Sequence, residues 1–381
     1  MKKRIAVLGA TGSIGASAID IISRNKPEIT GVDFEVVLLA ARSNRGGLDE
    51  ISGQFPKAVR VLACGASGKE TLISAIKEAH ADITVNGISG AAGLEPSAAA
   101  IESGSVLALA NKETIVMAGN LIFRLAKEKN VKIIPVDSEH SAVFHLLQGF
   151  PNENKIVKEI LLTASGGPFR NLSAEEMEYV KPSDALCHPT WKMGPKITID
   201  SASMANKGLE IIEACAFFGM KPDNIRVVIH PQSIVHSMIR LSNGIIYAQL
   251  SRPDMRHPIH DALYWPQNAP SDLQPLDFDC LKLEFEKPDF NKFPMLRLAE
   301  EAVRKNGLYP CAYNAANETA VAAFLEKKIR FTDIPRVTEQ VLQADWANEA
   351  QTLETILKAD ADARIKADIF IKESCSALSS L

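Results

Sequence analysis

The chain begins with a short apolar strand that runs directly into a glycine-rich turn, and this junction limits the folds open to its first part. Residues 4–8 read RIAVL, and GATGSIG follows from Gly9 to Gly15. Between a strand and a helix, glycines at this spacing allow a tight turn and a close approach of the backbone to a pyrophosphate. The pattern therefore predicts a dinucleotide-binding unit whose helix covers residues 13–24.

Strand-like and helical segments keep alternating as far as residue 150. This rhythm predicts an α/β fold, with a doubly wound (Rossmann-type) parallel sheet as the N-terminal domain over residues 1–150. Further helices are expected near residues 69–79, 95–103 and 118–129. Further strands are expected at residues 34–40, 57–63, 81–87, 105–110 and 132–136.

The pattern changes in the middle of the chain, where longer strand-like segments are joined by turns. A central α+β catalytic domain with some antiparallel pairing is predicted over residues 151–265. Residues 266–294 carry several prolines and little periodicity, which favours a linker. Helical periodicity from Met295 onward predicts a C-terminal helical bundle over residues 295–381.

Charge and apolar content exclude several classes of protein. The 46 acidic residues outnumber the 42 basic ones, so binding to nucleic acid through a broad basic surface is not expected. No segment approaches the roughly 18 consecutive apolar residues of a membrane helix, so a membrane is not expected as a partner either. The six cysteines form no CxxC pair, which indicates reduced, mostly buried thiols in a cytoplasmic protein.

The end of the strand predicted at residues 34–40 indicates which nicotinamide cofactor binds. There the chain reads Ala41-Arg42-Ser43, without the Asp or Glu that would hold the ribose hydroxyls of NAD. A cation beside a hydroxyl suits a 2′-phosphate, so NADP is favoured over NAD. The alternative is that Arg42 is an ordinary solvated arginine.

A pair of carboxylates follows the strand predicted at residues 132–136. If the chain stays extended there, Asp137 and Glu139 lie on one face, because side chains two residues apart point the same way. Two like charges so close repel each other unless a cation lies between them, which favours a divalent ion with oxygen ligands. An acidic pair that is merely solvated is the alternative.

The segment from His188 to Glu210, HPTWKMGPKITIDSASMANKGLE, carries the densest mixture of polar groups in the chain. Asn206, Lys207 and Glu210 are spaced to share one face of a helix. A helix start with a lysine and hydroxyls, beside the glycine loop after Ser165, would hold a phosphate. An amphipathic surface helix with a Lys–Glu pair is the alternative. The candidates for the N-cap of this helix are Asp200, Ser201 and Ser203.

Two other positions carry groups suited to a ligand. Lys112, in the sequence ANKE, follows a predicted strand and would lie at the ligand-binding edge of the sheet; a surface lysine is the alternative. His188 and Trp191 lie on a stretch flanked by proline and glycine, which suits a flexible loop near residues 185–195 that closes over substrate. A buried structural tryptophan is the alternative there.

Taken together, these motifs are similar to those of the 1-deoxy-D-xylulose 5-phosphate reductoisomerase family of the non-mevalonate isoprenoid pathway. The resemblance implies NADPH- and divalent-metal-dependent rearrangement and reduction of 1-deoxy-D-xylulose 5-phosphate to 2-C-methyl-D-erythritol 4-phosphate, in a homodimer. Retro-aldol and α-ketol routes are both compatible with it. The similarity covers nearly the full chain, through GATGSIG, ANKE, DSEHS, TASGGPF, HPTWKMGPKITIDSASMANKGLEIIEA, HPQSIVHS, DMRHPI and ANETAVAAFL.

The resemblance also implies a role for each matching residue. One Mg²⁺ or Mn²⁺ would be held by Asp137, Glu139 and Glu210. NADPH would be contacted by Thr11, Gly12, Ser13, Ile14, Ala41, Arg42, Ser43, Asn111, Glu113 and Gly194. The sugar phosphate would be bound by Lys112, Ser138, Glu139, Ser165, His188, Ser201, Asn206, Lys207 and Glu210, with Trp191 covering it and Met193 lining the site. The phosphate itself would be taken by Ser165, Ser201, Asn206 and Lys207. Catalysis would depend on Lys112, Asp137, Glu139, His188 and Glu210.

Two rival functions are weighed against this one. A semialdehyde or homoserine dehydrogenase shares the two-domain NADP architecture, but an aldehyde dehydrogenase of that kind needs a nucleophilic cysteine with a partner base. Cys187 beside His188 is the nearest arrangement to one. An NADP-sensing protein without chemistry would have no need for the three carboxylates.

At the cofactor turn, Ala41-Arg42-Ser43 stands where many family members have Gly-Lys-Asn, so the cation is retained.

Overall fold

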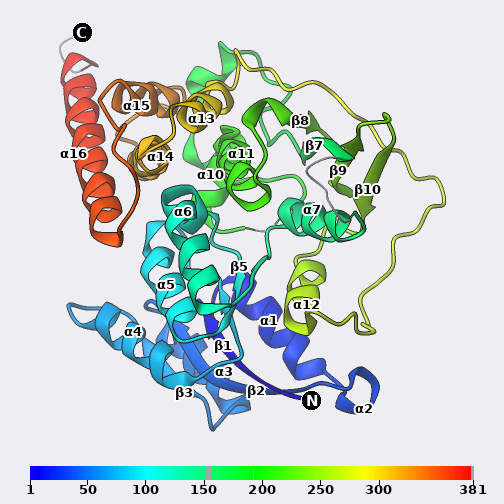
Figure 1. Cartoon of the computed structure of the whole chain (residues 1–381). Helices are drawn as coiled ribbons and strands as arrows, with labels where there is room; N and C mark the ends of the chain where they lie inside the picture. The colour runs from blue at the N-terminus through cyan, green and yellow to red at the C-terminus, as the bar shows by residue number, and fades with distance from the viewer. Residues whose placement is uncertain (151–155, 192, 379–381) are drawn as a thin grey trace. The chain divides into compact units, whose positions relative to one another are not determined.

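The computed structural model describes residues 1–150, 156–191 and 193–378 and divides the chain into two compact units (Figure 1). Unit 1 comprises Met1–Thr114, Ile122–His145 and Asp254–Leu276. Unit 2 comprises Ile115–Leu121, Leu146–Pro253 and Asp277–Leu381. The three-domain division drawn from the sequence remains a prediction beside these two units.

Unit 1 is built on a six-stranded sheet in which every neighbouring pair of strands is parallel. The strand order β3-β2-β1-β4-β5-β6 reverses direction between β1 and β4, where doubly wound folds bind their ligands. The predicted Rossmann-type sheet is thus confirmed. Its strands are β1 (Lys2–Leu8), β2 (Asp33–Ala41), β3 (Val59–Leu62), β4 (Ile83–Asn86), β5 (Val106–Leu109) and β6 (Ile133–Pro135).

Helices cover both faces of this sheet: α1 and α12 lie on one side and α4 and α5 on the other (Figure 1). Helix α6 begins at Lys112, earlier than predicted, and has a non-helical residue at Ala118, the predicted start. The helices are α1 (Ser13–Arg24), α2 (Pro27–Thr30), α3 (Arg45–Gln54), α4 (Gly68–Ala79), α5 (Leu94–Glu102), α6 (Lys112–Lys129), α7 (Ser138–Gln148) and α12 (Arg256–Tyr264), with a 3₁₀ turn η1 at Ala91–Gly93.

Helix α12 is far along the chain but completes the core of unit 1. Ile259 and Leu263 are wholly buried in the same apolar cluster as Val7 and Val85 of the sheet. The ammonium group of Lys3 donates to the carbonyls of residues 263, 264 and 265 at 3.0, 3.1 and 2.9 Å. These bonds give partners to carbonyl groups at the end of the helix that have none within it. Burial lowers the pKa of Lys3.

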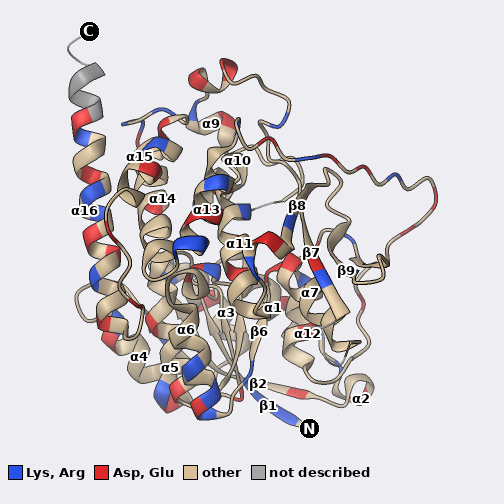
Figure 2. Ribbon diagram, turned by 45° about the horizontal axis from the view of Figure 1, so that its top comes forward, with Lys and Arg blue, Asp and Glu red and all other residues tan. Residues whose placement is uncertain are grey.

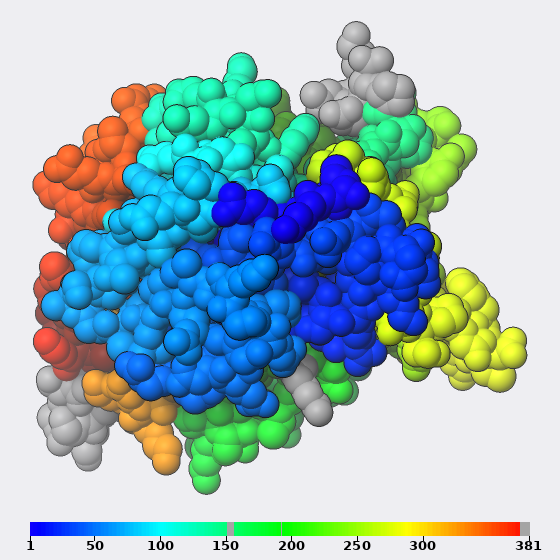
Figure 3. Space-filling view, turned by 90° about the horizontal axis from the view of Figure 1, so that it is seen from below, coloured from blue at the N-terminus to red at the C-terminus, as the bar shows by residue number. Residues whose placement is uncertain are grey.

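In Figure 3, residues of unit 1 coloured in blue and light blue form one continuous face.

Unit 2 contains a four-stranded sheet in the order β10-β9-β7-β8. Strands β7 and β8 are parallel, and the other pairs are antiparallel. The expected α+β region with some antiparallel pairing is therefore confirmed. The strands are β7 (Val157–Ala164), β8 (Ile225–Ile229), β9 (Val235–Leu241) and β10 (Ile246–Leu250). Among the described residues of unit 2 before residue 250, the helices are η2 (Glu176–Tyr179), α9 (Pro182–Ala185), α10 (Pro195–Ala202), α11 (Ala205–Phe218) and η3 (Pro222–Asn224).

The C-terminal part of unit 2 is helical, as the periodicity predicts. Helix α14 is buried on nearly every side, which marks it as the centre of this part. Helices α13, α15 and α16 pack around it. Charged residues of both signs alternate along the exposed side of α16 (Figure 2). The bounds are α13 (Pro294–Lys305), α14 (Tyr309–Leu325), α15 (Asp333–Leu342) and α16 (Leu353–Leu378).

The expectation of mostly buried thiols is wrong for the cysteines that the structure describes, and the side chain of Cys375 lies outside the description. Cys64, Cys187 and Cys280 are exposed, Cys215 is half-buried and Cys311 is buried. Burial raises the pKa of Cys215 to about 12, whereas the three exposed thiols lie in loops and turns, where a small side chain has no core to enter. Among the described helices, none combines the length and apolar character needed to cross a bilayer.

Candidate active site

The glycine turn after β1 has the geometry that a dinucleotide requires. Gly9 has a φ of 79°, and a Cβ there would lie 2.9 Å from the carbonyl oxygen of Gly87. A Cβ at Gly15 would lie 2.5 Å from the Cα of Ala10, so larger residues would push α1 away from the sheet. Gly12 is the exposed N-cap of α1 and provides no side-chain cap, so the first amides of the helix remain for a ligand. Thr11, Gly12, Ser13 and Ile14 therefore lie where a pyrophosphate would bind.

The end of β2 presents an exposed cation. Ala41 is buried, whereas Arg42 and Ser43 are exposed. Arg42 makes no hydrogen bond or ion pair with any residue that the structure describes, while the neighbouring Asn44 caps α3 by accepting from the Gly47 amide at 3.0 Å. The guanidinium is thus exposed, and its contact with a 2′-phosphate remains a prediction.

Asn111 has a structural role that sequence reasoning missed. Its side-chain oxygen accepts from the amide of Thr114 at 3.0 Å and so caps α6. Its nitrogen donates to the carbonyls of Ile88 and Gly90 at 2.7 and 2.9 Å and to Glu113 at 2.9 Å. Asn111 and Glu113, both predicted to contact the cofactor, therefore join the start of α6 to the turn after β4.

The expectation that the chain stays extended through Asp137 and Glu139 is wrong. Helix α7 begins at Ser138, so Glu139 lies in its first turn and does not share a strand face with Asp137. The Asp137 carboxylate accepts from the Glu139 amide at 3.3 Å, and such a cap favours a helix over a longer strand. The hydroxyl of Ser138 donates to Glu139 at 2.5 Å.

Asp137 is a nearly buried carboxylate held by two partners. The ammonium group of Lys112 lies 2.6 Å from its Oδ2, and Nδ1 of the wholly buried His140 lies 3.1 Å from its Oδ1. Burial acts to raise the pKa of Asp137, but Lys112 and His140 outweigh it and hold that pKa well below its usual range. The sequence assigned no role to His140, although a histidine three residues after Asp137 at a helix start was a usable signal.

In unit 2, the turn after β7 packs closely on helix α10. Gly166 and Gly167 both have positive φ values, of 84° and 68°. A Cβ at Gly167 would lie 2.6 Å from the carbonyl oxygen of Ser201, so only glycine permits this contact. The close approach brings the Ser165 turn beside Ser201, two segments that the sequence predicts to share a phosphate.

His188 lies in the irregular segment between α9 and α10, of which residue 192 is outside the described residues. Its Nδ1 accepts from the amides of Thr190 and Trp191 at 3.1 and 2.9 Å. The proton must therefore reside on Nε2, which lies 3.1 Å from the hydroxyl of Ser165 and can donate to it. Burial lowers the pKa of His188. Trp191 is half-buried beside the ring of His236, and Met193 and Gly194 follow it at the start of α10.

Helix α11 begins differently from the predicted capped helix. Asp200 and Ser201 belong to α10, and the N-cap is Met204, which has a φ of 62° and makes no side-chain cap hydrogen bond. The hydroxyl of Ser203 accepts from the Ala205 amide at 3.3 Å. Ser203 therefore makes a hydrogen bond like that of a cap, although it lies one residue before the N-cap Met204. The two helices are separate because the chain turns sharply at Met204.

The shared face of Asn206, Lys207 and Glu210 is confirmed. Asn206 donates to Oε1 of Glu210 at 2.6 Å, and Lys207 forms an ion pair with Oε2. Lys207 and Glu210 are both buried, so the alternative of a surface Lys–Glu pair is wrong. A buried carboxylate needs positive charge nearby, and hard oxygen ligands of this kind suit Mg²⁺ or Mn²⁺. Asp137 and Glu210 therefore fit the ligand set predicted for the ion.

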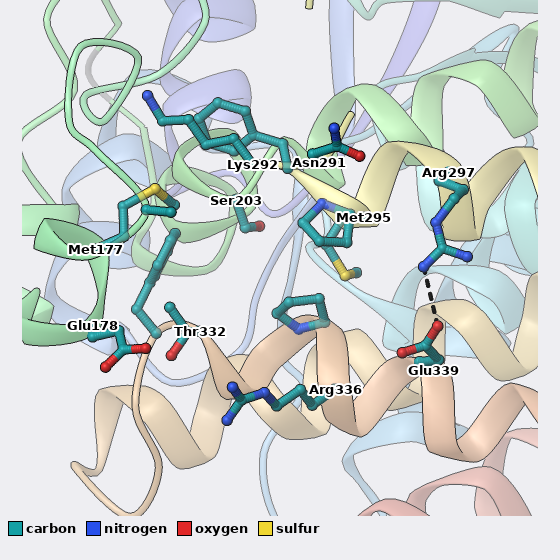
Figure 4. Close-up of a pocket in the computed structure, with 15 residues that line it drawn as sticks. Met177, Glu178, Ser203, Asn291, Lys292, Met295, Arg297, Thr332, Arg336 and Glu339 are labelled. Carbon is teal, nitrogen blue, oxygen red and sulfur yellow. Dashed lines mark hydrogen bonds and ion pairs between the residues drawn. The ribbon is translucent and has the colours of Figure 1, made fainter. Parts of the chain in front are cut away.

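A cavity of about 290 Å³ elsewhere in unit 2 has a different character (Figure 4). Met177, Met295 and Phe331 contribute apolar walls. Arg297 and Glu339 also line it and form an ion pair at 3.0 Å, drawn as the dashed line. Its lining includes Ser203 but none of the residues predicted to bind a ligand, so it is separate from the candidate site.

Comparison with known protein families identifies matches along most of the chain. Residues 5–65 and 58–119 match the family described as 1-deoxy-D-xylulose 5-phosphate reductoisomerase. Residues 133–218 match the family described as its C-terminal domain, and residues 250–366 match one described as DXP reductoisomerase C-terminal domain.

Individual proteins agree with the family matches. A 1-deoxy-D-xylulose 5-phosphate reductoisomerase from Treponema denticola is 46% identical over 95% of this chain and 96% of its own length. One from Pelodictyon phaeoclathratiforme is 47% identical over 97% of this chain and all of its own. Among solved structures, the Zymomonas mobilis reductoisomerase in complex with NADPH has a TM-score of 0.88 at 40% identity, covering 97% of this chain and 99% of its own. A reductoisomerase in complex with NADPH, fosmidomycin and magnesium has a TM-score of 0.88 at 37% identity, covering 97% and 98%.

We predict that the ring of His188 titrates below the unperturbed histidine value of about 6.5. Burial disfavours the imidazolium, and a proton on Nδ1 would face two backbone amides that now donate to it. Because the folded pKa is the lower one, the contribution of His188 to the free energy of unfolding is complete above about pH 6.5 and declines as the pH falls below it. An NMR titration of the ring measures both the pKa and the tautomer. A pKa above 6.5, or a proton on Nδ1, would contradict the assignment.

Proposed function

This chain belongs to the 1-deoxy-D-xylulose 5-phosphate reductoisomerase family, and from that premise we propose how its residues divide the work of the reaction. The protein converts 1-deoxy-D-xylulose 5-phosphate to 2-C-methyl-D-erythritol 4-phosphate, with NADPH as reductant and with a divalent metal ion. This step supplies the non-mevalonate route to isoprenoid precursors. The observation that carries the assignment is identity of about 45% to reductoisomerases over nearly the whole chain.

We propose that NADPH binds at the carboxyl ends of β1 and β2. The first amides of α1 take the pyrophosphate, and Arg42 takes the 2′-phosphate, because its guanidinium is exposed and has no acid beside it. Bound NADPH supplies the hydride that reduces the rearranged aldehyde. The full set of proposed contacts is Thr11, Gly12, Ser13, Ile14, Ala41, Arg42, Ser43, Asn111, Glu113 and Gly194.

We propose that Asp137, Glu139 and Glu210 hold one Mg²⁺ or Mn²⁺. The low pKa of Asp137 supports this, because a metal ligand must be deprotonated. When bound, the ion supplies Lewis-acid polarisation and a template for the adjacent oxygens of the substrate. Lys112, 2.6 Å from Asp137, would then be near the reacting oxygens, where it and Glu139 would steer protons during the rearrangement.

We propose that the substrate phosphate is bound by Ser165, Ser201, Asn206 and Lys207. The contact of Gly167 with Ser201 supports a common site for the two serines. His188 donates from Nε2 toward Ser165 or the substrate, and Ser138 contributes a further hydroxyl. Trp191 covers the bound sugar when the segment near residues 185–195 closes, and Met193 lines the site, which keeps water from the reacting carbons.

We also propose that the protein is a cytoplasmic homodimer that pairs through strand β10. This strand is at the edge of its sheet, and Ile246 and Tyr247 on it are 45% and 43% exposed. The unpaired backbone groups of an exposed apolar edge strand can form hydrogen bonds with another chain. The same strand in a second copy of the protein would pair with them symmetrically. The exposed thiols of Cys64, Cys187 and Cys280 support a reducing compartment.

The reaction itself is tested by following NADPH absorbance with 1-deoxy-D-xylulose 5-phosphate and Mg²⁺ or Mn²⁺. We expect oxidation that stops with chelator and that falls at least about a hundredfold in Glu210→Gln, since the variant removes one charged ligand from the ion. Glu213→Gln, the same change one turn further along α11, serves as the matched control and is expected to keep metal-dependent activity. Equal loss in both variants, with both folded, would argue against a metal role for Glu210. Absence of oxidation by folded wild-type protein that binds NADPH would instead favour an NADP-sensing protein.

The role of Arg42 is tested by comparing the two nicotinamide cofactors. Arg42→Ala removes the proposed contact to the 2′-phosphate, so KM for NADPH should rise by about tenfold or more, while KM for NADH stays nearly constant. Arg45→Ala, an exposed arginine three residues further on, is the control. If Arg42→Ala leaves the preference for NADPH unchanged, Arg42 is a solvated arginine.

The proposed dimer is tested by light scattering on purified protein. Ile246→Lys places a charge on the exposed edge strand and should shift the protein from dimer to monomer. Ile369→Lys, the same change at a 51% exposed isoleucine on α16, should leave the dimer intact. A wild-type monomer, or a dimer unaffected by Ile246→Lys, would exclude β10 as the contact.

A further inference from the structure

Asp200 is a buried carboxylate directly before Ser201, and it is joined to the C-terminal helices. Its Oδ1 accepts a hydrogen bond from the side-chain nitrogen of Asn317 on α14 at 2.7 Å. Its Oδ2 lies 2.8 Å from the ammonium group of Lys196 at the start of α10. We propose that Asn317 is a positioning residue for the substrate phosphate, because by holding Asp200 it fixes the hydroxyl of Ser201. This inference rests on the proposed phosphate role of Ser201.

Burial of the Asn317 side chain lowers the stability of the fold unless its side-chain nitrogen makes a necessary hydrogen bond. The residue is wholly buried, and its side-chain oxygen has no hydrogen-bond partner among the described residues. A buried amide with an unsatisfied oxygen destabilises a fold relative to an apolar side chain of the same size. The nitrogen, by contrast, faces a carboxylate that is only 1% exposed and that burial alone would destabilise. The hydrogen bond to Asp200 therefore accounts for an asparagine at this position.

The contacts of α10 explain how this bond reaches the phosphate site. The helix is short, from Pro195 to Ala202, and it follows the segment that carries His188. Lys196 at its start and Asn317 on α14 both pair with Asp200, so the side chain joins the beginning of α10 to the helical part of unit 2. On its other side, the carbonyl of Ser201 contacts Gly167. A shift of α10 would move Ser201 relative to Ser165, and a phosphate held by both would lose one contact.

The same helix provides a matched control. Asn314 lies three residues before Asn317, is also wholly buried, and likewise has a side-chain oxygen without a hydrogen-bond partner among the described residues. Its nitrogen donates to Glu318 of the same helix at 3.2 Å. Substitution of Asn314 therefore disturbs α14 without removing a bond to the substrate segment.

The test compares Asn317→Leu with Asn314→Leu in steady-state kinetics and thermal unfolding. Asn317→Leu should raise KM for 1-deoxy-D-xylulose 5-phosphate by about tenfold, the equivalent of one lost hydrogen bond, with KM for NADPH unchanged. Asn314→Leu should change neither KM, and its melting temperature measures how far a substitution within α14 alone disturbs the fold. Asn317→Ala is measured in parallel, because its smaller side chain cannot clash. It replaces Asn317→Leu in the comparison if the leucine variant does not fold. An unchanged substrate KM in the Asn317 variants, or an equal rise in the Asn314 variant, would overturn the inference.

A double-mutant cycle with Ser201→Ala separates this inference from the proposed function. If Asn317 acts through Ser201, the Asn317 substitution should add little to KM once Ser201 is already alanine. If Ser201→Ala raises the substrate KM while the Asn317 variants do not, the positioning role fails alone. If Ser201→Ala has no effect on that KM, the phosphate role of Ser201 fails, and the positioning role fails with it.

Discussion

Buried carboxylates that each need a positive partner are the constraint on which the chemistry of this protein depends. Asp137 is matched by Lys112 in unit 1, and Glu210 by Lys207 in unit 2. Removing such charges from water is expensive, and a pair stays favourable only with good geometry and further hydrogen bonds. Both pairs have those bonds, from His140 and Asn206. Each pair places a carboxylate that we propose as a metal ligand beside a lysine that we propose to contact substrate oxygens.

Close contacts at glycines set the geometry around these charges. Gly9 allows the chain to turn after β1 beside Gly87, which directly follows the neighbouring strand β4, at the crossover where we propose that the dinucleotide binds. Gly167 allows a similar approach in unit 2, since its contact with the Ser201 carbonyl brings together the two segments that we propose to bind the phosphate. In both places a single added methyl group would displace a backbone segment that we assign to a ligand. In both units, a strand thus ends in a glycine turn at the place where we propose that a ligand binds.

Local sequence predicts the features that arise from local geometry. The turn at Gly9–Gly15 and the shared face of Asn206 and Glu210 follow from spacing within a few residues, and the parallel sheet follows from the alternation of strands and helices up to residue 150. The failures are of another kind. The sequence does not indicate that the chain leaves the extended conformation at Ser138, because the Asp137 cap and a longer strand are both compatible with DSEHS. It also gives no sign that Asn317 reaches Asp200 or that Lys3 holds the end of α12, since these bonds join residues 117 and about 260 positions apart.

The most direct test of the whole account is the fate of the hydride. Purified protein is incubated with 1-deoxy-D-xylulose 5-phosphate, a divalent ion and NADPH deuterated at the transferable position, and the product is analysed by mass spectrometry. We expect 2-C-methyl-D-erythritol 4-phosphate that carries one deuterium on carbon, formed when the ion is present and absent when it is chelated. Unlabelled product, or no product from folded protein that binds both NADPH and the ion, would contradict it.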